Sequence, residues 1–457
     1  MARHLRCRLC GTTYPLEPRY VCEECLGPLD AVRVVEGGPA GSGSGAAEVL
    51  RRTISAGPPT LWRYAPFLPV DPDPASDLGA GWTPLLPAPR LGAALGLRRL
   101  YLKNDAANPT WSFKDRVVAV GIAAARRFGF TVAACASTGN LANAVAACAA
   151  RAGLRAVVFV PRGLEAEKLV LSAVYGATIV EVDGTYDDVN RLCTQVADEY
   201  RWAFLNVNLR PYYADGAKTL GYEVAEQLGW RLPDHVVVPM ASGNLLVKIA
   251  RAFAELAEVG LVAARPVQVH GAQPAGCAPI ATAFAAGAAQ VAPVRPHTAV
   301  RSLAIGSPAD GLFALRAIRD SGGRAVGVTD EEAADAVALL ARTERRQAEA
   351  HLTHKEREKK KKEREKIRAR RPYHTTYDLP VELRQRIKEL AEQHGVPASQ
   401  LATLGLLRFV EDLAARRVDL GAHKVPSRSP RYDFNLVISM EDYPATFAAP
   451  RRGRKRS

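Results

Sequence analysis

The chain has 457 residues, 48% of them hydrophobic, which is enough to bury a sizeable core in about two to four domains. No run approaches the roughly 18 uncharged apolar residues of a membrane helix, and no secretory signal is recognisable, so we expect a cytoplasmic protein. The net charge of +14 is uneven, because residues 345–457 hold 27 Lys and Arg against 15 Asp and Glu. A nearly neutral enzyme-like body followed by a basic, polyanion-binding part is therefore predicted.

The first predicted element is a small metal-binding ribbon over residues 1–35. Its cysteines follow the pattern C-x2-C-x11-C-x2-C, and they are Cys7, Cys10, Cys22 and Cys25. Two such pairs supply the four thiolates of a closed tetrahedral zinc site, so we predict structural zinc. A pair of disulfides is the alternative, which a reducing cytosol disfavours. Residues 36–80 are predicted to form a glycine-rich linker and a packing segment.

From residue 81 onward, short apolar runs alternate with helical patterns, which is typical of a parallel α/β sheet covered on both faces. The predicted strands, mostly buried, are 99–102, 132–136, 156–160, 177–182, 236–239 and 267–270. The predicted helices are 119–128, 141–152, 164–174, 186–200, 219–228 and 245–256. Ligands of such sheets gather at the carboxyl ends of strands, in the turns that lead into helices.

Three of these turns carry residues suited to ligand binding. Residues 108–116 read N-P-T-W-S-F-K-D-R, and a lysine at a turn before a helix is placed for imine chemistry, although a solvated lysine is the alternative. Residues 137–140 read S-T-G-N and open a helix, which suits either an anion site or a plain N-cap. Residues 240–244, M-A-S-G-N, suit a phosphate monoester or an ordinary turn.

Together these turns resemble the fold-type II pyridoxal phosphate enzymes, and the lysine turn resembles that of the threonine synthase family. Further matching motifs are T-P-L-L at 83–86, D-G-A-K-T at 215–219, Q-P-A-G-C at 273–277 and S-L-A-I-G at 302–306. The resemblance covers about residues 83–343 and extends to the four-cysteine ribbon. It implies a two-domain α/β fold like that of the tryptophan synthase β subunit. Its large domain would be 81–130 with 203–344, and its small inserted domain 131–202.

The resemblance also implies roles for individual residues. Lys114 would be the catalytic residue and would hold pyridoxal 5'-phosphate as a Schiff base. The other cofactor ligands would be Asn140, Ala241, Ser242, Gly243 and Asn244. The substrate ligands would be Ser137, Thr138, Gly139, Lys168 and Arg210. The implied reaction converts O-phospho-L-homoserine and water to L-threonine and phosphate, and a serine/threonine dehydratase-like lyase using the same Lys114 and Asn140 is the alternative.

The sequence departs from the family pattern at several positions. Trp111 replaces the commoner glycine, the phosphate loop has one glycine, and Tyr213 stands where some relatives have a phosphate-binding arginine. A helix is predicted over 328–344, with Thr329 and Glu332 as its capping box. After Glu344 we find neither the expected E-x-A-G-G turn nor the strand-end Thr or Ser for the pyridine nitrogen. We therefore predict a C-terminally truncated catalytic body. An enzyme whose activity is impaired by the truncation is an alternative to an active one.

The remaining residues form a separate module in this interpretation. Residues 345–371 are a charged linker, and 421–457 are a basic tail. Residues 372–420 resemble a ribbon-helix-helix unit, with one helix over 381–394 and a second helix capped by residues 396–399. The resemblance implies a homodimer that binds DNA through His374, Thr376 and Ser399. A helical hairpin used only for oligomerisation is the alternative.

Overall fold

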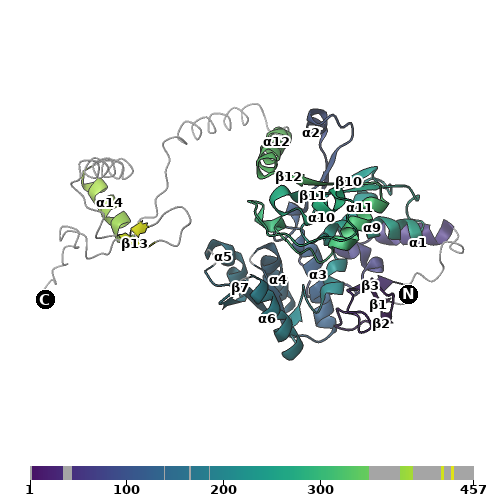
Figure 1. Cartoon of the computed structure of the whole chain (residues 1–457), viewed down its shortest axis with the longest axis horizontal. Coiled ribbons are helices and arrows are strands. Elements are labelled where there is room, and N and C mark those ends of the chain that lie inside the picture. The colour runs from purple at the N-terminus through teal and green to yellow at the C-terminus, as the bar shows by residue number, and fades with distance from the viewer. Residues whose placement is uncertain are drawn as a thin grey trace. The chain divides into compact units, whose positions relative to one another are not determined.

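Figure 1 shows the computed structural model of the chain. The described residues are 3–33, 44–137, 139–163, 166–184, 186–348, 381–394, 424–426 and 434–436. The chain divides into two compact units, Met1–His351 and Leu352–Ser457. None of the helices in the described residues has the length and apolar character needed to cross a membrane.

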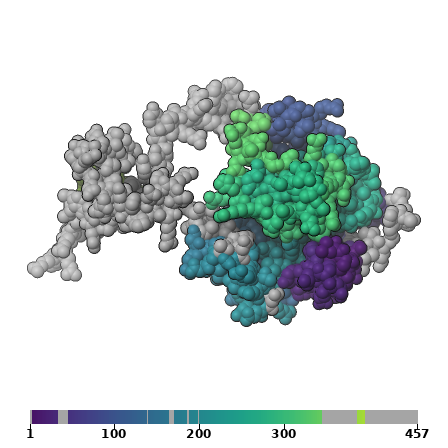
Figure 2. Space-filling view, viewed as in Figure 1, coloured from purple at the N-terminus to yellow at the C-terminus, as the bar shows by residue number. Residues whose placement is uncertain are grey.

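The N-terminal ribbon is a three-stranded antiparallel sheet in the order β2-β1-β3. Its strands are β1 Arg3–Cys7, β2 Thr13–Tyr14 and β3 Leu29–Arg33. The ribbon is too small to bury a core of its own, and Leu5 and Leu29 instead share a buried cluster with Trp62 and Tyr212 of the body. Figure 2 shows the ribbon, in purple, lying directly against the body. The ribbon therefore folds as part of the larger unit.

The next segment leads from the ribbon into the two α/β sheets. Its elements are α1 Ser44–Ser55, η1 Leu61–Phe67, β4 Leu85–Pro87, α2 Pro89–Ala94, β5 Tyr101–Lys103 and η2 Asp105–Ala107. The prediction of a parallel core strand at 99–102 is wrong, because β5 pairs antiparallel with β4 in a hairpin and Tyr101 is exposed. Tyr64 and Phe67 of η1 pack into the core of the second sheet.

The first α/β sheet is parallel, with the order β8-β7-β6-β9. Its strands are β6 Val132–Ala136, β7 Arg155–Pro161, β8 Thr178–Val182 and β9 Ala203–Phe204. The associated helices are α3 Lys114–Arg127, α4 Asn140–Ala152, α5 Ala166–Val174 and α6 Tyr186–Glu199. All five residues of β6 are buried, so this strand is central to the sheet. The pairing of β9 with β6 takes the sheet two residues beyond the predicted boundary at 202.

The second sheet is also parallel and has the order β10-β11-β12. Its strands are β10 His235–Pro239, β11 Gln268–Pro274 and β12 Ala325–Val328. The neighbouring helices are α7 Arg210–Asp215, α8 Lys218–Gln227, α9 Asn244–Glu258, α10 Pro279–Ala285, α11 Gly311–Asp320 and α12 Asp330–Ala348, with the short η3 Ala275–Cys277 and η4 Arg301–Leu303. The capping box predicted at the start of α12 is confirmed, since Thr329 and Glu332 each accept the other's backbone N–H, at 3.1 and 2.8 Å.

Among the described residues no helix covers one face of this second sheet, which differs from the prediction that helices cover both faces. Val237 in β10 is 70% exposed and Val326 in β12 is 50% exposed. The strand register places both side chains on the same face, because Val237 lies opposite His270 and Val326 lies opposite Ala272. The other face packs against α9 and α11 and forms the core.

The second unit contains three described elements, α14 Val381–Gln393, β13 Lys424–Pro426 and β14 Phe434–Leu436, the two strands being antiparallel partners. The helix predicted from residue 381 is confirmed. The strand and second helix of the predicted ribbon-helix-helix unit lie outside the described residues. So do the predicted DNA-contacting residues His374, Thr376 and Ser399.

A close backbone contact fixes α3 against the segment that joins α7 to α8. A Cβ atom at Gly216 would lie 2.4 Å from Arg116 O and 2.7 Å from Val117 Cα.

We expect Gly216→Ala to lower the free energy of unfolding by about 1–3 kcal/mol, because backbone atoms must move apart. Urea denaturation measures this loss. Gly45→Ala in α1, where a Cβ meets nothing within 4 Å, serves as the control and should be nearly neutral; equal losses in both variants would contradict the packing argument.

Candidate active site

A buried arginine holds together the segments that surround the predicted cofactor lysine. Arg116 in α3 is fully buried, and it donates from Nε to Asp105 Oδ2 at 2.7 Å and from Nη2 to Glu223 Oε2 at 2.8 Å. Lys103 Nζ in β5 donates to the same Glu223 oxygen at 2.6 Å. Burial disfavours ionisation of Asp105, but Arg116, with Thr83 and Lys103, outweighs this effect and holds the pKa of Asp105 below its ordinary value. The network therefore ties β5, η2 and α8 to the first turn of α3.

The turn before α3 is fixed by its own side chains. The buried Asp115 carboxylate accepts from Thr110 N at 2.8 Å and from Thr110 Oγ1 at 2.7 Å, and Asn108 Oδ1 accepts from Gly81 N at 2.9 Å. Trp111 has φ +58° and is 65% exposed. This backbone conformation favours glycine, which explains why glycine is the expected residue at the position and implies local strain with tryptophan.

Lys114, the first residue of α3, is half-buried, and its amine differs from those of the buried lysines in the body because it lacks a carboxylate partner among the described residues. Its Nζ donates to Tyr213 Oη at 3.3 Å and lies 4.7 Å from the centre of the Phe113 ring. Within the described part of the chain no carboxylate pairs with it, whereas the buried Lys218 and Lys248 each pair with two carboxylates. The Lys114 amine is therefore available to a ligand.

The turn between β10 and α9 has the features of a phosphate cradle. Gly243 has φ +90°, and a Cβ there would lie 2.8 Å from Ala314 Cβ, so the position requires glycine. Ser242 O accepts from Asp310 N at 3.0 Å. Among the described residues, no acceptor takes the backbone N–H groups of 241–243, which lead into the N-terminus of the 15-residue helix α9. Free N–H groups at a helix N-terminus bind anions.

The predicted substrate turn follows β6 and opens α4. Ser137 Oγ accepts from Gly139 N at 3.3 Å, and Asn140 is exposed as the first residue of α4. Thr138 lies outside the described residues, as does the side chain of Lys168, whose backbone belongs to α5.

Packing brings the three turns to one side of the body. α3 packs against α4. The C-terminal end of α3 leads into the start of β6, and α4 begins just after β6 ends. The N-termini of both helices therefore lie at the edge of the sheet where β6 ends. Leu245 at the start of α9 packs into the same core cluster as Phe113 and Tyr213. The predicted cofactor and substrate residues of these turns therefore share one region of the fold, as parallel sheets dictate.

Arg210 is held by a residue that sequence reasoning missed. It is the first residue of α7, its side chain is 33% exposed, and its Nη2 donates to Asp310 Oδ2 at 2.6 Å. Asp310 Oδ1 accepts from Arg8 Nη1 of the ribbon at 2.5 Å. Nothing in the local sequence of Asp310 distinguishes it from an ordinary acidic residue before a helix. Tyr213 is a departure from the family pattern in the sequence, and in the structure its hydroxyl accepts a hydrogen bond from the Lys114 amine.

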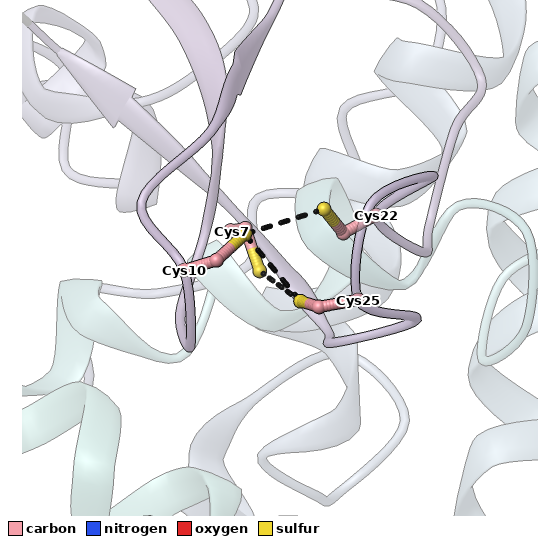
Figure 3. Close-up of side chains that lie close together, drawn as sticks. All are labelled: Cys7, Cys10, Cys22 and Cys25. Carbon is pink, nitrogen blue, oxygen red and sulfur yellow. Dashed lines mark hydrogen bonds between the residues drawn. The ribbon is translucent and has the colours of Figure 1, made fainter.

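The four ribbon cysteines converge as their spacing predicts (Figure 3). Their sulfur atoms all lie within 4.8 Å of one another. Cys7 and Cys10 each lie 3.4 Å from Cys25, and Cys10 lies 3.5 Å from Cys22. These separations exceed the bond of about 2.05 Å in a disulfide, and the cysteines are free thiols. Four converging thiols are a donor set suited to zinc.

The residues of this site fit pyridoxal phosphate. An amine free of a carboxylate partner suits the cofactor aldehyde, and the glycine-containing turn before α9 suits its phosphate. Residues 77–355 match the family model described as "Pyridoxal-phosphate dependent enzyme". The chain belongs to this family, and the predicted two-domain α/β class and cofactor are confirmed.

Two threonine synthases are among the proteins similar to this chain. The chain is 35% identical to a threonine synthase of Methanosarcina acetivorans over 344 residues, which are 75% of this chain and 82% of that protein. It is 38% identical to a threonine synthase of Methanocaldococcus jannaschii over 343 residues, 74% of this chain and 82% of that protein. A solved structure of a T.th. threonine deaminase is 26% identical with a TM-score of 0.47, covering 57% of this chain and 80% of that one.

The buried network of Arg116, Glu223 and Lys103 predicts that the loss of one charge strongly lowers the stability of the protein. We expect Glu223→Gln to lower the free energy of unfolding by about 3 kcal/mol or more, because Arg116 and Lys103 lose their shared carboxylate in a buried site. Urea denaturation measures the change. The control is Glu258→Gln, which removes the exposed pair with Arg251 and should cost less than about 1 kcal/mol. A Glu223→Gln variant as stable as this control would refute the structural role of the network.

Proposed function

We propose that the chain is a threonine synthase, which converts O-phospho-L-homoserine and water to L-threonine and phosphate. The observation that carries the proposal is the alignment with proteins of that name over three quarters of the chain at 35% and 38% identity. The position of Lys114 at the start of α3, beside the glycine-containing turn before α9, supports it independently.

Lys114 is the residue on which the chemistry depends in this proposal. Its Nζ is the amine that joins the cofactor aldehyde and, once free, carries protons to and from the substrate. When bound, pyridoxal phosphate supplies an electron sink that makes the α-proton and then the β-proton of an amino acid removable. Tyr213 Oη, 3.3 Å from Nζ, orients the amine by hydrogen bonding.

Other residues hold the two anionic ends of the ligands. Residues 241–244 bind the cofactor phosphate through backbone N–H groups, with Asn140 on the ring hydroxyl. The Ser137 turn, with Thr138 and Gly139, receives the substrate carboxylate. Arg210 and Lys168 bind the substrate phosphate, and their positive charges stabilise the departing group. Water then adds at the β-carbon.

A truncated catalytic body is the second part of the proposal. The open sheet face with Val237 and Val326 supports it, because parallel sheets normally have helices on both faces. The truncation favours the alternative of an enzyme with impaired activity. For an active enzyme, the alternative is a serine/threonine dehydratase-like lyase. In the same proposal, 81–130 and 203–344 form the large domain and 131–202 the small one.

For the terminal parts we propose a structural zinc in the ribbon, 1–35, and a dimerising, DNA-binding module at 372–420. The convergence of the four cysteines supports the zinc. The helix α14 and the charge of residues 345–457 support the module. The contacts proposed for His374, Thr376 and Ser399 rest on the sequence pattern.

The activity is tested through Lys114. We expect Lys114→Ala to lower phosphate release from O-phospho-L-homoserine by at least roughly 100-fold, because the proton-carrying amine is lost. Lys114→Arg keeps the charge and cannot join an aldehyde, so it should lose the visible absorbance of bound cofactor as well as the activity. Phosphate release by either variant at the wild-type rate would contradict the assignment. Ammonia release from threonine without phosphate release would favour the dehydratase alternative.

The zinc proposal predicts one zinc ion per chain, measured by elemental analysis after removal of loosely bound metal. Cys10→Ser should lower this ratio, because a tetrahedral site loses one of its four ligands. Chelation should also lower the thermal midpoint, since the ribbon shares its core with Trp62 and Tyr212. The control is Cys277→Ser, which alters a buried thiol far from the ribbon in sequence. A native protein with full stability and no zinc would refute the site.

A further inference from the structure

Asp310 lies where three parts of the body meet. Its side chain is 2% exposed, and its two carboxylate oxygens accept from different arginines, Oδ1 from Arg8 at 2.5 Å and Oδ2 from Arg210 at 2.6 Å. Its backbone N donates to Ser242 O at 3.0 Å. A single residue thus contacts the ribbon, the start of α7 and the turn before α9.

The contact with the turn before α9 is close as well as hydrogen-bonded. A Cβ at Gly243 would lie 3.2 Å from Asp310 O, and the same carbonyl accepts from Ala314 N at 2.9 Å in α11. The backbone of Asp310 is therefore fixed by α11 on one side and packs on the proposed phosphate turn on the other. Any reorientation of Asp310 changes what Ser242 and Gly243 pack against.

Arg8 is an equally fixed cation. It stands between Cys7 and Cys10, and its backbone N donates to Pro28 O at 3.0 Å. Its guanidinium carbon lies 3.5 Å from the centre of the Phe313 ring, and its Nε lies 3.5 Å from Asp30 Oδ2. Only 11% of its side chain is exposed. The folded ribbon therefore holds this positive charge in place against the Asp310 carboxylate.

The charges at this junction bear on anion binding. The two oxygens of the Asp310 carboxylate are divided between the guanidinium groups of Arg8 and Arg210, and Arg8 also lies near Asp30. Asp310 takes one of the five N–H donors of Arg210, and the side chain is 33% exposed, so further donors remain for a ligand. Because Arg8 engages the other oxygen of Asp310, Arg210 binds this carboxylate through one donor and keeps others for a phosphate group.

We propose that Asp310 is a positioning residue, which sets Arg210 and the turn at 241–244 relative to each other, and that Arg8 fixes Asp310 from the ribbon. This inference rests on the proposed function, in which Arg210 binds the substrate phosphate and the turn binds the cofactor phosphate. It assigns the ribbon a second task, because the ribbon completes the electrostatics of the site as well as the core.

The test compares binding constants and turnover in the full chain. Asp310→Asn keeps the shape but offers one carbonyl oxygen to two arginines, so one of them loses its acceptor. We expect a rise of roughly tenfold in KM for O-phospho-L-homoserine, with kcat changed by less than about threefold, and a rise of roughly threefold in the Kd of pyridoxal phosphate. Cofactor binding is followed by visible absorbance. Asp310→Glu restores the charge and should recover part of each loss.

Arg8→Ala should raise the same KM, and its effect should disappear in the Asp310→Asn background, because Arg8 acts through that carboxylate. Arg3→Ala is the matched control, since it removes another ribbon arginine that pairs with the body at Asp71, 2.8 Å away, and should leave both constants unchanged. Equal effects of Arg8→Ala and Arg3→Ala, or additive effects of Arg8→Ala and Asp310→Asn, would overturn the proposal.

The cofactor measurement separates this inference from the proposed function. If the wild-type chain binds pyridoxal phosphate but releases no phosphate from O-phospho-L-homoserine, the threonine synthase activity is refuted. The positioning role is then decided by the cofactor Kd. Unchanged cofactor affinity in Asp310→Asn would reject it, and a weakened affinity that Asp310→Glu recovers would support it. Should Asp310→Asn fail to fold, Arg8→Ala and Arg8→Lys supply the same comparison.

Discussion

The placement of Arg116 between Glu223 and Asp105 is the interaction on which the rest of the body depends. A fully buried guanidinium is stable only when its desolvation is offset by well-placed carboxylates, so this residue dictates where η2 and α8 must lie. Because Arg116 is two residues beyond Lys114, the same contacts determine where the amine is presented. Removal of any one member leaves a buried charge with one partner fewer.

A second buried network serves the ribbon in the same way. Lys248 in α9 lies between Asp30 of β3 and Asp215 of α7, at 2.9 and 2.8 Å, and is 2% exposed. Burial disfavours the charge of Asp30, but Lys248, Arg8 and Lys218 together outweigh this effect and hold the pKa of Asp30 below its ordinary value. The ribbon is therefore joined to the helix that follows the proposed phosphate cradle. Charge pairing and shared apolar core act together here, since neither alone would order so short a segment.

The sequence was most informative where structure depends on neighbours in the chain. The strand at 132–136, the capping box of Thr329 and Glu332, and the convergence of the cysteines all follow from local patterns. Prediction failed where distant residues decide. The charged Asp115 and Arg116 hid the first turn of α3, because Glu223, the buried carboxylate that pairs with Arg116, lies far along the chain. The role of Asp310 and the pairing of β9 with β6 depend on tertiary contacts that have no local signal.

The scarcity of lysine amines outside ion pairs has a consequence for chemical selectivity. Residues 1–344 contain five lysines among 34 basic residues, the others being arginines, which do not form imines under ordinary conditions. Lys103, Lys218 and Lys248 are buried in ion pairs, and the side chain of Lys168 lies outside the described residues. A reactive aldehyde that diffuses over this body therefore meets few competing lysine amines. The arginine-rich composition of residues 1–344 therefore limits imine formation at other sites of this body while leaving Lys114 open to the carbonyl compound it needs.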